Sequence, residues 1–148
     1  MMRTLGWCVG ILAALFTGLL VGCSSDEFKT YPVTGRVVFA DGSPLPVGKI
    51  YIETRDKKYG LGIGATGNIR EDGTFEIRTY KPGDGAPPGE YIVFIRGAEV
   101  GGTIGMRPED RRPGTALIHP KYLNAGTTDL KIQIKQGPND FELVVDRP

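Results

Sequence analysis

The segment Thr74–Thr79 reads Thr-Phe-Glu-Ile-Arg-Thr, and it decides the fold class. Phe75 and Ile77 alternate with polar residues, so one face of the segment is apolar and the other is polar. Such alternation is typical of a β-strand that buries one face. Asp72-Gly73 comes directly before it, and glycine readily adopts the positive φ of a tight hairpin turn. The pattern therefore predicts a strand that begins at a hairpin.

Six further segments carry a strand signal. They are Val33–Phe39, Gly48–Glu53, Gly64–Ile69, Glu90–Arg96, Leu130–Lys135 and Asp140–Val145. Glu90–Arg96 is apolar on both faces, which predicts a central strand. Side chains expected in the core are Phe75, Ile77, Val93, Ile95, Ile132 and Phe141. With 22 Gly and 11 Pro in the chain, short strands separated by turns predict an all-β sandwich or barrel.

Several motifs resemble those of a known domain family. Val33–Val37, Asp41–Leu45 and Asp72–Ile77 are similar to the opening of a carboxypeptidase-regulatory-like domain. Residues 80–91, 118–122 and 137–141 resemble segments of small planctomycete-type predicted lipoproteins that carry such a domain. The resemblance implies a seven-stranded transthyretin-like or immunoglobulin-like β-sandwich over residues 31–148. It implies no enzymatic activity.

The first 22 residues have the composition of a signal peptide. Leu5–Gly22 is uncharged and mostly apolar, and it follows a head that carries Arg3, which predicts an N-terminal apolar signal helix. Leu20-Val21-Gly22-Cys23 resembles the bacterial lipobox, whose cysteine is lipidated and becomes the N-terminus after cleavage. Residues 23–30 would then form a polar tether of about 25 Å when extended. The alternative is an uncleaved transmembrane anchor, because the apolar run is close to the length that spans a bilayer.

These features predict secretion across the inner membrane and a lipid-anchored protein of the cell envelope, on the periplasmic face or at the outer membrane. The chain has 18 Lys and Arg against 17 Asp and Glu, so it lacks the basic excess typical of nucleic-acid-binding proteins. Cleavage removes Trp7 and Cys8, and the lipid occupies Cys23. One histidine without a free thiol cannot build a tetrahedral zinc site, so no metal and no cofactor are expected.

The loop Lys81–Gly89 is the first candidate binding site. Pro87-Pro88 favours an extended, stiff path, and loops of fixed shape often carry function. Its candidate residues are Tyr80, Lys81 and Asp84. The alternative is a structural corner that leads the chain into the central strand.

The segment 97–117 is the second candidate, because it is too long for a simple hairpin loop. Arg107, Arg111 and Arg112 could hold an anionic ligand or a partner protein, since guanidinium groups bind carboxylates and phosphates through two hydrogen bonds. The alternative is a solvated loop whose own carboxylates neutralise the arginines, because exposed ion pairs contribute little.

Catalytic chemistry has little support in the composition. His119 is the sole histidine, and Ser43, the sole serine after the tether, lies in a Gly-Ser-Pro turn, so a Ser-His-Asp triad is formally possible only. Most carboxylates alternate with apolar strand residues, where a solvated carboxyl is a poor general acid. Calcium binding at Asp41, Asp72 or Asp84 stays open, although Asp-Gly is ordinarily a turn signal.

We therefore predict a non-enzymatic protein. One hypothesis is a membrane-tethered β-sandwich that binds an envelope protein or polysaccharide or has a structural role. The other is a carbohydrate-binding module, in which Tyr51 and Tyr59 flank a loop and could stack on a sugar, although Tyr51 could equally cover a sheet face.

Overall fold

The computed structural model describes residues 28–54, 56–59, 64–102, 109 and 112–148. The strands in these residues are β1 (Val33–Phe39), β2 (Gly48–Glu53), β3 (Gly64–Ile69), β4 (Thr74–Glu76), β5 (Gly89–Arg96), β6 (Glu99–Val100), β7 (Thr115–Ala116), β8 (Lys131–Ile134) and β9 (Asn139–Val145). Two single-turn 3-10 helices, η1 (Lys57–Tyr59) and η3 (Pro120–Leu123), are the helices among them. The described part of the chain is therefore all-β, as predicted.

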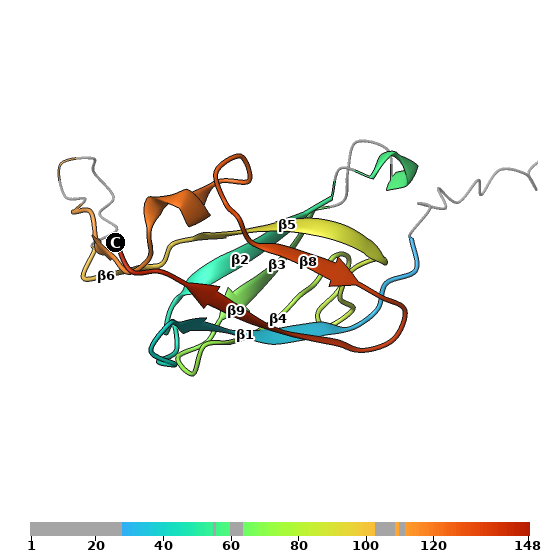
Figure 1. The fold of residues 1–148 in the computed structure, drawn as a ribbon, viewed down its shortest axis with the longest axis horizontal. Helices are drawn as coiled ribbons and strands as arrows, with labels where there is room; N and C mark the ends of the chain where they lie inside the picture. Colours follow the sequence, from blue (N-terminus) through green and yellow to red (C-terminus); the bar gives the residue numbers. More distant parts are fainter. Residues whose placement is uncertain (1–27, 55, 60–63, 103–108, 110–111) are drawn as a thin grey trace, which may run out of the picture.

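Two larger sheets and one small sheet make up the fold. The three-stranded sheet has the order β4-β1-β9, and the four-stranded sheet has the order β3-β2-β5-β8. β6 and β7 pair separately at one end of the molecule (Figure 1). β1 and β9 pair in parallel along seven residues, whereas the pairings of β1 with β4 and of β2 with β3 and β5 are antiparallel. β5 pairs with both β2 and β8, which confirms the prediction of a central strand.

The core lies between the two larger sheets and receives side chains from both. Alternation directs Val33, Val37, Phe75, Leu143 and Val145 into it from one sheet, and Ile50, Ile52, Tyr91, Val93, Ile95, Ile132 and Ile134 from the other. Five of the six side chains predicted to be buried are buried, whereas Phe141 is only partly buried. Apolar alternation thus explains how two layers form one core.

Gly35 of β1 allows three strands to pack closely. It pairs with Phe75 of β4 on one side and with Phe141 of β9 on the other. A Cβ atom at Gly35 would lie 2.6 Å from the Phe75 ring and 2.2 Å from the carbonyl oxygen of Phe141. The Phe75 ring therefore occupies the space that any other residue's side chain would need.

The observed strands differ from the predicted ones in their bounds and in their number. β5 and β9 begin one residue earlier than predicted, and β8 is one residue shorter at each end. β4 ends at Glu76 and not at Thr79, because the chain crosses there toward the other sheet, where Arg78 pairs with Thr66 of β3. The described residues also hold nine strands in place of the seven predicted. The additional pair, β6 with β7, lies in the segment 97–117, and strands of two residues are too short to show alternation in sequence.

The predicted signal helix, Cys23 and the first five residues of the predicted tether lie outside the described residues. Neither of the two short helices in the described part is long and apolar enough to cross a membrane.

We predict that Phe75→Ala lowers the free energy of unfolding by about 3–5 kcal/mol, the usual cost of deleting a core aromatic ring. Phe75 is 2 % exposed and lies against Gly35, so its removal leaves a cavity between three strands. Chemical denaturation measures the change. Val144→Ala is the control, because Val144 is 48 % exposed on β9, and it should change the value by less than about 0.5 kcal/mol. A loss under about 1 kcal/mol for Phe75→Ala would contradict the assignment of the core.

Candidate functional site

The outer face of the four-stranded sheet carries the most distinctive side chains outside the core. Residues that alternate with the buried isoleucines of β2 point outward, and they include Tyr51 and Glu53. On β5 the outward residues include Ile92 and Phe94, opposite the buried Val93 and its neighbours. The register pairs Tyr51 with Phe94 and Glu53 with Ile92. Two aromatic residues distant in sequence are thereby brought side by side.

Tyr51 and Phe94 form an aromatic platform on this face. Their ring centroids are 5.1 Å apart and their planes differ by 8°, a stacked arrangement. Aromatic residues directly opposite each other on antiparallel strands stabilise the pairing by about 0.2–1 kcal/mol. Tyr51 is half-buried and Phe94 is 9 % exposed, so Tyr51 presents more of the platform to solvent.

Two cations border the aromatic platform. The Lys49 Nζ atom lies 5.4 Å from the Tyr51 ring centroid. The Arg96 guanidinium carbon lies 5.6 Å from the Tyr51 centroid and 5.3 Å from the Phe94 centroid. Lys49 and Arg96 are register partners, so two like charges lie next to each other and both are attracted to the negative ring faces. One end of the platform is therefore positive.

Two surface hollows meet beside the platform at Glu53. The first is lined by Tyr51, Phe94, Gly64 and Thr66, and a Cβ atom at Gly64 would have no neighbour within 4 Å. The second is lined by Thr54, Asp56, Glu90, Ile92 and Lys131. The Lys131 ammonium group is 4.0 Å from the Glu90 carboxylate. An aromatic surface with hydroxyl and carboxylate groups around it can bind a ligand that has both apolar and hydrogen-bonding faces.

The predicted binding loop Lys81–Gly89 is held by its own hydrogen bonds. Asp84 Oδ1 accepts the backbone N–H of Thr79 at 2.8 Å. Asp84 Oδ2 accepts those of Tyr80 at 2.9 Å and Lys81 at 3.1 Å. Burial raises the pKa of the Asp84 carboxyl. The three N–H donors and the nearby Lys81 lower this pKa by more, so that it lies below its usual range. The carboxylate thus organises the loop.

Two tyrosine hydroxyls fix the far end of the same loop. Tyr91 donates to the carbonyl oxygen of Pro87 at 3.0 Å, and Tyr59 donates to that of Pro88 at 2.5 Å. Tyr59 is buried, so it is not available as the sugar-stacking ring considered from the sequence. Tyr80 is 44 % exposed and Lys81 is exposed. The Tyr80 and Lys81 side chains are therefore at the surface, while the Asp84 carboxylate accepts hydrogen bonds from the backbone of the loop.

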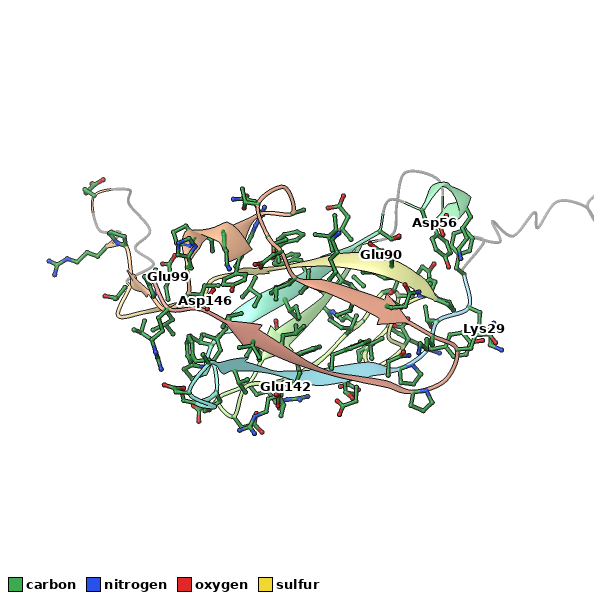
Figure 2. All side chains as sticks on the ribbon, in the orientation of Figure 1. Lys29, Asp56, Glu90, Glu99, Glu142 and Asp146 are labelled. Carbon is green, nitrogen blue, oxygen red and sulfur yellow. The ribbon has the colours of Figure 1, made fainter. Side chains whose placement is uncertain are left out.

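The two predicted binding loops lie apart. Lys29, near the start of the described chain, and Glu99 of β6 mark opposite ends of the molecule (Figure 2). The loop that contains Tyr80 belongs to the end of Lys29, since the Tyr80 hydroxyl accepts the N–H of Phe28 at 3.1 Å. Arg107 and Arg111 lie outside the described residues, and Arg112 is exposed shortly before β7. The two loops are thus not brought together into one site.

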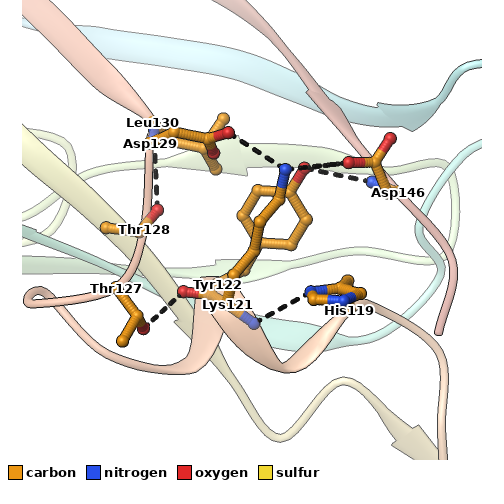
Figure 3. A network of polar contacts seen from close by, with 8 residues as sticks. All are labelled: His119, Lys121, Tyr122, Thr127, Thr128, Asp129, Leu130 and Asp146. Atoms are coloured by element: carbon orange, nitrogen blue, oxygen red, sulfur yellow. Dashed lines mark hydrogen bonds and ion pairs between the residues drawn. The ribbon is translucent and has the colours of Figure 1, made fainter.

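His119 takes part in a polar network around η3, drawn in Figure 3. Its Nδ1 atom accepts the backbone N–H of Lys121 at 3.2 Å and so caps the helix. Lys121 Nζ lies 3.0 Å from Asp129 and 2.9 Å from Asp146, and Tyr122 donates its hydroxyl to Asp146 at 2.9 Å. The hydrogen bonds from Lys121 and then Tyr122 lower the pKa of the Asp146 carboxyl. This network ties η3 to the end of β9.

A Ser-His-Asp arrangement is not assembled in the described residues. Ser43 bonds to Asp41 and Arg147, whereas His119 bonds to the backbone of Lys121. Within the same residues, no three His, Cys, Asp or Glu side chains are grouped so that they could hold a metal ion.

Sequence reasoning missed the partnership of Tyr51 with Phe94. The alternation of β2 placed Tyr51 on the outward face, but nothing in the sequence gives the register between β2 and β5. Residues 54–88, which include β3 and β4, separate the two strands, so their register is set only when the core is packed.

Comparisons with known proteins give no family. No protein-family model matches the chain, and no curated protein matches it. Among solved structures, the crystal structure of a 9R-lipoxygenase from Cyanothece PCC8801 is similar over 81 % of this chain and 17 % of the lipoxygenase chain, with 16 % identity and a TM-score of 0.40. This chain thus spans less than a fifth of the length of that enzyme.

We predict that Asp84→Ala lowers the free energy of unfolding by about 1–3 kcal/mol, because three N–H groups lose their acceptor. Asp84→Asn should cost less, since one carbonyl acceptor remains. Glu142→Gln, at an exposed position on β9, is the control and should change stability by less than about 0.5 kcal/mol.

The effect of Asp84 should also depend on pH. Its pKa is lower in the folded protein than in the unfolded chain, so the stabilisation is present above about pH 4 and is lost as the pH falls through the folded pKa. Denaturation curves of wild type and Asp84→Asn should therefore converge in acid. A difference that stays constant from neutral pH into strong acid would contradict the role of the ionised carboxylate.

Proposed function

We propose that this protein is a non-enzymatic lipoprotein of the cell envelope, tethered to a membrane through lipid on Cys23, whose domain binds an envelope partner. We further propose that the domain is a seven-stranded sandwich of the transthyretin-like or immunoglobulin-like type, with β6 and β7 as an added hairpin. The three-stranded and four-stranded sheets and their shared core support this fold type. The lipobox-like Leu20-Val21-Gly22-Cys23 supports the tether.

The aromatic platform is the observation that carries the binding function. Tyr51 and Phe94 stack on the outer face of the sheet, where Phe94 is buried and Tyr51 is half-buried, although polar residues would suffice for solubility there. Hollows border the platform, and no described segment of the chain fills them. We propose that the outer face of the four-stranded sheet, more than the loop around Asp84, contacts the partner.

The state of the carboxyl groups supports a non-catalytic role. A general acid near neutral pH needs a raised pKa. Hydrogen bonds lower the pKa of Asp41 to about 2, mainly through Ser43, and they also lower the pKa values of Asp72 and Asp146. These carboxylates stabilise turns and an ion-pair network, which is a structural use of charge.

The platform also favours a second candidate, the carbohydrate-binding module. The apolar face of a sugar ring can stack on an aromatic side chain that reaches the surface, here mainly the half-buried Tyr51. The Glu53 carboxylate and the Thr66 hydroxyl line the adjacent hollow and can bond to sugar hydroxyls. A polysaccharide of the envelope is therefore the ligand that this face would fit if the partner is not a protein.

Retention on envelope material tests the binding function. A column that carries envelope protein or purified envelope polysaccharide should retain the wild-type domain. Tyr51→Ala should reduce this retention several-fold while the protein stays folded. Val144→Ala, an exposed apolar residue of the other sheet, is the matched control and should bind as wild type does. Equal retention of wild type and Tyr51→Ala would remove the platform from the proposal. Loss with the polysaccharide alone would identify the module as carbohydrate-binding.

Labelling and fluorescence test the tether. Labelled palmitate should enter the wild-type protein, whereas Cys23→Ala should block incorporation and processing. Cleavage also removes Trp7, the single tryptophan of the chain, so the mature protein should show tyrosine emission alone. Tryptophan emission from the purified mature protein would show that the apolar segment is an uncut anchor.

A further inference from the structure

The start of the described chain is attached to the domain by its side chain and its backbone. The Phe28 ring meets the Tyr59 ring edge to face, with centroids 4.8 Å apart and an interplanar angle of 84°. The Phe28 N–H donates to the Tyr80 hydroxyl at 3.1 Å. The domain therefore begins before Tyr31, and Phe28 is the point where the tether meets it.

The tether that remains is short. Only residues 24–27 lie between Cys23, the proposed lipid site, and Phe28. Five chain steps span at most about 18 Å. The polar headgroup layer on each side of a bilayer is about 5–7 Å thick. Because the acyl chains on Cys23 lie in the hydrocarbon, Phe28 can lie no farther than about 18 Å from the edge of the hydrocarbon, which is at or just above the headgroup layer.

The end of the domain around Phe28 has side chains suited to that place. We call this end the membrane end and define it by Phe28, Lys29, Lys58, Tyr80 and Lys81. Phe28 is 39 % and Tyr80 is 44 % exposed, and they are two of the four exposed large hydrophobic side chains in the described residues. Aromatic rings are enriched at the headgroup level of membrane proteins, and lysine stems reach from apolar surfaces to charged groups.

The charged groups at this end are of both signs. Asp56, Asp84 and Asp140 lie there beside the lysines, and Asp26 and Glu27 directly precede Phe28 in the sequence. Lys29 Nζ lies 5.4 Å from the Tyr31 ring, and Lys81 is exposed on the corner loop. Lys58 is 3.5 Å from Asp56, which offsets its charge. The β8–β9 turn adds an exposed Lys135 at the same end, since Asn139 beyond it donates its N–H to Pro32. Basic residues near a membrane surface are attracted to anionic lipids.

We propose that the membrane end rests on the lipid headgroups of the bilayer that holds the Cys23 lipid. This inference depends on the proposed lipidation of Cys23. The strands run along the long axis of the molecule, so the β6–β7 end lies farthest from the tether (Figure 1). With the membrane end on the bilayer, the β6–β7 end points into the envelope space, and the aromatic platform lies on the side wall between the two ends.

Tryptophan quenching in vesicles tests this orientation. The mature chain has no tryptophan after cleavage, so a single one can be introduced at a chosen place. Phe28→Trp keeps an aromatic ring against Tyr59, and Tyr80→Trp is a second reporter at the same end. Val100→Trp, at a 46 % exposed site on β6, is the matched reporter at the opposite end. The lipidated proteins are placed in phosphatidylcholine vesicles with a quarter phosphatidylglycerol and a nitroxide headgroup label.

The expected result is quenching several times stronger at Phe28→Trp and Tyr80→Trp than at Val100→Trp. In anionic vesicles, Lys29→Gln with Lys81→Gln should weaken the quenching at the membrane end. Arg36→Gln with Arg70→Gln is the charge-matched control, since both arginines contact the β3–β4 turn, which lies a full strand length from η1, and it should have no such effect.

The outcomes separate the two proposals. Intact mass shows whether the protein carries acyl chains, and a purified mature protein without them overturns the lipoprotein proposal together with this inference. Lipidated protein that floats with the vesicles but is quenched equally at both ends overturns the orientation alone. Quenching at the membrane end that also persists without phosphatidylglycerol keeps the orientation and assigns the contact to the aromatic side chains.

Discussion

The close approach of three strands at Gly35 is the constraint on which the rest of the structure depends. β1 lies between β4 and β9, and at Gly35, its third residue, the Phe75 ring takes the place of a side chain. This contact is possible only where β1 has no Cβ atom. It allows the first and last strands of the domain to pair in parallel along seven residues. The beginning of the domain is thereby held beside its final strand, and the two sheets enclose one core.

The arrangement of the strands also determines at which end of the molecule several loops lie. The strands run roughly along the long axis, so the β8–β9 turn and the β6–β7 pair lie at opposite ends (Figure 1). The tether junction, η1 and the corner loop of Asp84 share one end through the contacts of Phe28 with Tyr59 and Tyr80. The β6–β7 hairpin occupies the opposite end. Attachment and recognition can then use different surfaces, with the aromatic platform on the sheet between them.

The polar side chains mostly serve the architecture. Asp84 organises the corner loop, Asp72 accepts the N–H and hydroxyl of Thr74 in the β3–β4 turn, and Lys121 ties η3 to β9 through Asp146. Asp84, Ser43 and His119, which suggested binding or catalysis when considered one by one, therefore have backbone or side-chain partners within the fold. The aromatic platform is different, because its rings stack on each other and leave the hollows beside them open. This contrast is why the proposed function rests on the sheet face.

Local sequence patterns predicted most of the secondary structure, although not β6 and β7 or the end of β4. Alternation is a local property, so β1, β2 and β3 have the bounds that the pattern predicts, and Phe75 and Ile77 are buried as expected. The Asp-Gly and Pro-Gly pairs likewise predicted the turns, because glycine permits a positive φ and proline fixes φ. The folded structure was needed to show which strands are neighbours, that Tyr51 faces Phe94, that Asp84 bonds to its own loop and that Phe28 belongs to the domain. Each of these depends on register and packing between residues far apart in the chain, and such contacts are selected by the closure of the whole core and not by any short stretch of sequence.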